Sequence, residues 1–110
     1  MIDETISQIE ARLKDAGSLS EETRQELTRL LATLKSEVTE LSKTHAEQAQ
    51  SIAGFAQTST HEAIREEKNP QLLQLSLDGL AASVEGIEES HPRLVQLVNR
   101  ICTMLSNLGI

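Results

Sequence analysis

The stretch LTRLLATLKSEVTEL, residues 27–41, decides the fold, because its apolar residues return in alternating steps of four and three. This spacing is the a/d seam of a coiled coil, the stripe along which one amphipathic helix packs against another. A second run of the same kind begins at Leu73. The seam positions are Leu27, Leu31, Leu34, Val38, Leu41, His45, Gln48, Ile52 and Phe55 in the first run, and Leu73, Leu77, Leu80, Val84, Ile87, His91, Leu94, Val98, Ile101, Leu105 and Leu108 in the second.

A proline turn separates the two runs. Asn69 followed by Pro70 suits the start of a helix, with asparagine as the cap and proline at the first helical position. No proline interrupts the first run, so the pattern predicts one helix over residues 19–68 and an antiparallel hairpin with the second run. Unbroken, a helix of about 47 residues spans roughly 70 Å, far more than a compact domain of this size. A break near residues 42–46 is the alternative that the sequence leaves open.

Shorter helices flank this hairpin. Ile6, Ile9 and Leu13 predict a helix over residues 3–16, which Gly17 ends. The next helix has two candidate caps: Ser18, which forms a capping box with Glu21, and Ser20.

Pro92 divides the last part of the chain into helices over residues 70–89 and 91–108. The seam keeps its phase across Pro92, so we expect either a kink or a short break before a separate helix, with the helix axis roughly preserved. The predicted fold is therefore a single all-α domain, residues 1–110. It consists of a long antiparallel helical hairpin with the short N-terminal helix packed at its base.

The far end of this hairpin is uncharged, since Lys, Arg, Asp and Glu are absent from Gln48 to His61. Two helices alone bury too little surface to be stable, whereas a second copy would complete a four-helix bundle. We therefore expect a homodimer. The predicted interface consists of Gln48, Ile52, Phe55, Ala56, Leu73, Leu77, Leu80 and Val84.

Composition excludes several classes of function. The 110 residues carry 17 acidic and 10 basic side chains, a net charge of -7, and the basic ones are scattered. Nucleic acids and anionic membranes select clustered Lys and Arg, so neither is an expected partner. The acidic start MIDETISQIE is unlike a signal peptide, and Cys102 has no second cysteine to pair with. We expect a cytoplasmic protein with no membrane span.

Two segments near the C-terminus resemble a known family. His91-Pro92-Arg93-Leu94 and the tail Asn107-Leu108-Gly109-Ile110 are similar to the domain-of-unknown-function 4404 family, short bacterial proteins that end in His-Pro-x-Leu and Asn-Met-Gly-Ile segments. Leu19 to Arg24 resembles the start of the family's second helix. The resemblance covers residues 5–41 and 70–110, with Leu108 in place of Met and an insertion near 43–68 that lengthens the hairpin. It implies a helical fold and a bacterial origin, and it supplies no catalytic residues.

Motifs of enzymes are absent from the sequence: there is no phosphate-binding glycine loop, HExxH, GxSxG or CxxC. We expect no cofactor and no catalysis. His45 and His91 occupy seam positions that fall opposite each other, so two copies could offer four imidazoles to a metal ion. A pH-sensitive layer, or a polar layer that only sets helix register, is the alternative. The tail is expected to act as a structural clasp, in which Gly109 caps the helix and Ile110 docks onto the base.

The expected function is a non-enzymatic protein-interaction or scaffold module that associates with itself, and an unidentified protein is the other expected partner. The alternative is a metal- or pH-responsive regulatory bundle that uses His45 and His91.

Overall fold

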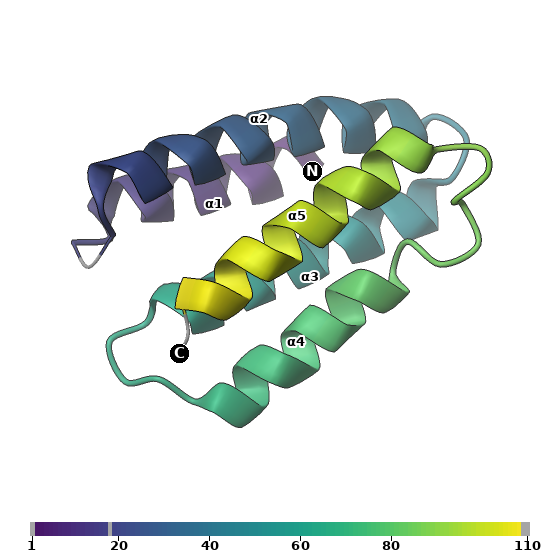
Figure 1. Cartoon of the computed structure of the whole chain (residues 1–110). Helices are drawn as coiled ribbons and strands as arrows, with labels where there is room; N and C mark the ends of the chain where they lie inside the picture. Colours follow the sequence, from purple (N-terminus) through teal and green to yellow (C-terminus); the bar gives the residue numbers. More distant parts are fainter. Residues whose placement is uncertain (1, 18, 109–110) are drawn as a thin grey trace.

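The computed structural model describes residues 2–17 and 19–108, which form five helices joined by short loops (Figure 1). The helices are α1 (Ile2–Asp15), α2 (Glu21–Ser42), α3 (Ala46–Ile64), α4 (Pro70–Ala82) and α5 (Pro92–Leu108). The prediction of an all-α chain is confirmed, because the described residues contain no strand. A radius of gyration of 13.0 Å and extents of 37 × 24 × 22 Å leave no room for the expected long arm.

The single helix predicted over residues 19–68 is wrong, since the chain turns at 43–45 and α3 runs back along α2 (Figure 1). At this point a side-chain hydroxyl bonds to a backbone carbonyl of the last helical turn: Ser42 Oγ donates to the Thr39 carbonyl at 2.6 Å. Such local bonds compete with the backbone hydrogen bonds of the helix. His45 then leaves the helical region of the backbone, at φ -134° and ψ 64°. The break that the sequence left open near 42–46 is the one that forms.

The prediction that the helix axis continues across Pro92 is also wrong, although a separate helix does begin there. Helix α4 ends at Ala82, and after the 83–91 loop α5 turns back along α4 (Figure 1). Gly86 makes this reversal possible, because its φ of 91° lies in the left-handed region that favours glycine. Pro92 begins α5, where its fixed φ and missing N–H cost nothing.

The two hairpins, α2–α3 and α4–α5, are copies of one unit. Each seam residue of the first has a counterpart 46 positions later in the second, as Leu27 has Leu73 and His45 has His91. The identical pairs in the described residues of the two hairpins are Glu21 and Glu67, Gln25 and Gln71, Leu27 and Leu73, Leu31 and Leu77, Leu34 and Leu80, Val38 and Val84, His45 and His91, and Gln50 and Gln96. The two heptad runs are therefore not the two arms of one hairpin, and each of them builds a hairpin of its own.

The copies pack around an approximate two-fold axis. Helix α2 contacts α3 and α5, and its counterpart α4 contacts α5 and α3. Both hairpin loops lie at the same end of the bundle (Figure 1). Even their hydrogen bonds correspond: the N–H of His45 donates to Leu41 and the N–H of His91 donates to Ile87, each at 2.8 Å.

Helix α3 lies at the centre of the molecule and is contacted by all four other helices. Its small residues let these neighbours approach closely, and eight of its 19 residues are buried. This central position accounts for the uncharged stretch from Gln48 to His61, which the sequence suggested was a bare arm. The correction extends to the predicted dimer interface, because six of its eight residues are core side chains of a single chain: Ile52, Ala56, Leu73, Leu77, Leu80 and Val84.

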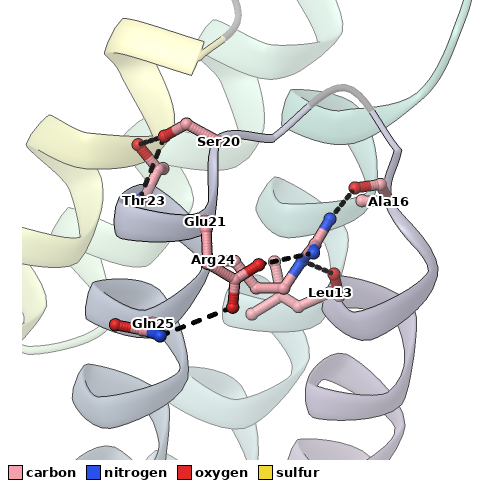
Figure 2. A network of polar contacts seen from close by, with 7 residues as sticks. All are labelled: Leu13, Ala16, Ser20, Glu21, Thr23, Arg24 and Gln25. Atoms are coloured by element: carbon pink, nitrogen blue, oxygen red, sulfur yellow. Dashed lines mark hydrogen bonds and ion pairs between the residues drawn. The ribbon is translucent and has the colours of Figure 1, made fainter.

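Helix α1 covers the outer groove between α2 and α3. Ile6, Ile9 and Leu13 are buried in the core beneath it. Figure 2 shows how the end of α1 is held: Arg24 of α2 donates to the carbonyls of Leu13, in the last turn of α1, and of Ala16, just after it.

The cap of α2 is Ser20, whose Oγ accepts the N–H of Thr23 at 3.2 Å (Figure 2). Of the two predicted caps this is the second. Ser18, the first, lies outside the described residues.

Candidate functional site

The exposed large apolar side chains of the described residues all belong to α3 and α4. They are Phe55, Leu72 and Leu75, which are 40%, 43% and 59% exposed. The ring of Phe55 lies over Gly79, where a Cβ atom would come within 2.3 Å of the ring. Gly54 precedes Phe55 and has open space above it. We call these five residues the α3–α4 face.

The repeat supplies an internal comparison, because the face between α2 and α5 is the counterpart of the α3–α4 face. There Glu26 accepts from Arg100 at 2.9 Å and also pairs with Arg29. The counterparts of these three ionic residues are Leu72, Gly54 and Leu75. The α2–α5 face thus carries exposed ion pairs, while the α3–α4 face carries leucine and glycine at the corresponding positions.

This difference has a physical consequence for binding. Burying an ion pair at an interface costs desolvation free energy that its mutual attraction often fails to return. Leucine and phenylalanine gain about 25 cal/mol for each Å² removed from water. The α3–α4 face is therefore the side of the bundle best suited to contact another protein surface.

The structure brings the two seam histidines together. The ring centroids of His45 and His91 lie 6.0 Å apart in an edge-to-face arrangement. Each Nδ1 contacts the hydroxyl of the preceding residue, Thr44 at 2.8 Å and Ser90 at 2.9 Å. The proximity that seam phase predicted is confirmed, although the chain reaches it through two separate loops. No cluster of three or more His, Cys, Asp or Glu suited to a metal ion occurs among the described residues.

Gln48 also lies at this end of the bundle and joins the two loops. Its amide donates to the carbonyls of Ser83 at 3.1 Å and Glu85 at 3.4 Å. Gln48 was predicted to lie in an interface between two chains, but in the structure its hydrogen bonds are within one chain. Seam phase identified a residue that meets the second run, but it could not say that both runs belong to one compact bundle.

A second groove runs between α4 and α5. It is lined by Gln74, Leu77, Asp78, Ala81, Cys102, Thr103, Ser106 and Asn107. Burial raises the pKa of the Cys102 thiol, and the neighbouring charge of Asp78 raises it further. The thiol is therefore protonated at neutral pH, and it is half-buried. The sequence did not predict this groove, because it placed α4 and α5 along one axis, whereas in the structure they lie side by side.

The tail residues have separate places. Pro92 begins α5, Leu94 is buried in the core, and Asn107 is exposed on the groove between α4 and α5. Gly109 and Ile110, to which we assigned the clasp, lie outside the described residues.

The geometry defines an all-α bundle of two helical-hairpin repeats with one covering helix. A model of the family described as a domain of unknown function (DUF4404) matches residues 27–110, and the chain belongs to this family. The match spans residues 43–68, which form the first loop, the central helix α3 and its exit, so this segment does not lengthen a hairpin as the sequence suggested. No curated protein and no solved structure shows a significant match. None of the described helices is long and apolar enough to cross a bilayer.

Proposed function

We propose that the protein is a non-enzymatic interaction module that associates with itself through the α3–α4 face. The observation that carries this proposal is the contrast within the repeat: Leu72 and Leu75 replace the counterparts Glu26 and Arg29. Exposed leucine and phenylalanine side chains gathered on one face mark contact surfaces in soluble proteins. The homodimer expected from the sequence is retained, and its interface moves from the core positions to this face.

The shape of the face supports helix packing. Gly79 lets the ring of Phe55 lie over α4, and Gly54 leaves open space beside it on α3. Two such faces related by a two-fold axis would bring four helices together, with the exposed leucines of each chain against the partner's Phe55 and Gly54. Among the three apolar side chains, Leu75 is the most exposed and reaches furthest from its own core.

The test is the molar mass in solution across a hundredfold range of concentration, measured by light scattering on a sizing column. We expect a dimer at high concentration. The Leu75→Glu variant should remain folded and become monomeric, because each interface would then bury two unpaired carboxylates. Arg29→Glu, the same change at the counterpart position on the α2–α5 face, is the matched control and should still dimerise. A wild-type chain that stays monomeric throughout would refute the proposal.

A second candidate function is favoured by the histidine pair, which suits a divalent metal ion such as zinc. Zinc–imidazole bonds of about 2.0–2.1 Å hold two ring centres about 5–6 Å apart on one tetrahedral ion. The observed 6.0 Å separation of the His45 and His91 rings is close to this value. A metal at Nε2 also needs Nδ1–H to donate elsewhere, and Thr44 and Ser90 supply oxygen acceptors. Water or a second copy would complete the coordination.

Thermal unfolding with and without zinc tests this candidate. At a zinc concentration ten times Kd, binding stabilises the fold by about 1.4 kcal/mol, a rise in Tm of roughly 5 °C. His45→Ala and His91→Ala should each abolish the rise, whereas His61→Ala should keep it. If the rise survives in both single variants, zinc binds elsewhere and the candidate fails.

A further inference from the structure

The repeat builds the same groove twice, and the described residues fill only one of the two. Helix α1 occupies the groove between α2 and α3. We infer that the groove between α4 and α5 binds a basic amphipathic helix of a partner protein. This inference is independent of the proposed self-association, which uses the opposite side of α4.

The two grooves correspond residue by residue. The counterparts of the lining residues of the α4–α5 groove are Thr28, Leu31, Ala32, Lys35, Ala56, Gln57, Thr60 and His61. Three of them contact α1 directly. Lys35 Nζ lies 3.0 Å from Ser7 Oγ and 3.9 Å from Glu10 Oε1, Gln57 donates to Gln8 at 2.8 Å, and His61 Nδ1 contacts Arg12 at 2.6 Å. The groove that lies open is thus a copy of one that demonstrably seats a helix.

The walls of the open groove are low enough to admit a helix. Ala81 stands where Lys35 rises in the occupied groove, and Thr103 replaces the longer Gln57. Leu77 and the half-buried Cys102 provide an apolar floor. The rim is polar, so the seated helix would carry a narrow apolar stripe flanked by hydrogen-bonding side chains.

The charge of the open groove is the reverse of that of the occupied one. Lys35 and Arg24, which hold α1, are replaced by Ala81 and Pro70. Asp78 takes the place of Ala32, and within the groove its carboxylate accepts only the Gln74 amide, at 2.8 Å.

This reversal selects the occupant. The acidic Glu10 of a second copy's α1 would lose its pairing with Lys35, because Ala81 stands at that position, and would lie within one helical turn of the acidic Asp78. Another copy of α1 is therefore disfavoured. A lysine or arginine at the position of Glu10 would instead pair with Asp78. The net charge of -7 on the chain favours the approach of a basic partner as well.

The experiment uses a fluorescein-labelled peptide of residues 2–15 in which Glu4→Lys and Glu10→Lys reverse the net charge. Anisotropy is measured against the full chain. We expect saturable binding that is roughly tenfold tighter than that of the unmodified peptide, because two acidic side chains that the groove repels become basic. In the Asp78→Lys variant this preference should invert. Lys35→Ala, the matched change in the groove that α1 occupies, should leave binding of the charge-reversed peptide unchanged.

Alkylation of Cys102, the single cysteine of the sequence, gives a second readout. The bound peptide should slow the reaction severalfold, because Cys102 lines the groove. Failure of both peptides to saturate below about 1 mM, the range of the weakest specific complexes, would overturn the inference. It is equally overturned if Lys35→Ala weakens binding and Asp78→Lys does not, since the peptide would then be exchanging with α1. Leu75→Glu separates the two proposals: it should abolish self-association and leave peptide binding intact.

Discussion

Gly79 is the residue on which the packing of Phe55 depends. A Cβ at this position would lie 2.3 Å from the ring, whereas a Cβ at Gly54, also in a helix, meets nothing within 4 Å. Alanine in place of glycine within a helix stabilises it by about 1 kcal/mol. Gly54→Ala should therefore raise the free energy of unfolding by about this amount, and Gly79→Ala should lose the gain by displacing the ring.

A double-mutant cycle by urea denaturation checks this explanation. In a Phe55→Ala background, Gly79→Ala should recover the full gain of about 1 kcal/mol, which gives a coupling of about 1–2 kcal/mol. The measurements are made on dilute, monomeric samples, so that self-association does not contribute. Equal effects of Gly79→Ala in both backgrounds would mean that the ring does not constrain this position.

At the scale of helices, seam phase predicted which residues are buried better than it predicted where helices end. Leu27, Val38 and Leu80 are core residues, as their spacing indicated. The end of α2 depends on weak, local effects: hydroxyl groups at Ser42 and Thr44 that bond to nearby carbonyls. Such bonds contribute about 1 kcal/mol each, so tertiary packing decides whether they end a helix. The heptad pattern continues through the turn because both sides of it face the same core.

The same ambiguity explains why the candidate sites were only partly predictable. The contact of His45 with His91 follows from register alone, and register survives whether the helices are continuous or folded back. The exposure of Phe55, Leu72 and Leu75 does not follow from register, because it depends on which helix covers each side of α3 and α4. A periodicity argument assigns a residue to a face of its helix, and only the fold determines what lies against that face.

Because the whole molecule is built from two repeats, side chains of the α2–α5 face can be placed at the corresponding positions of the α3–α4 face. Exchanging the ionic pair of the α2–α5 face onto its copy requires Leu72→Glu with Gly54→Arg. At the counterpart positions Glu26 and Arg100 pair at 2.9 Å, and Gly54 has open space for a side chain. The double variant should fold with nearly unchanged stability, because exposed ion pairs contribute about 0–1 kcal/mol. It should also be monomeric at concentrations where the wild-type chain dimerises, measured by sedimentation velocity.

The reverse exchange, Glu26→Leu with Arg100→Gly, is the complementary experiment. It leaves the α3–α4 face intact and removes the Glu26–Arg100 pair from the α2–α5 face, so each chain would present a second, less charged face with Arg29 as the remaining member of its ionic group. Two faces per chain permit association beyond the dimer, and species larger than dimers should appear as concentration rises. If instead both double variants sediment like the wild-type chain, the charges of these faces do not control association. The apolar character of Leu72 and Leu75 would then require an explanation within the monomer.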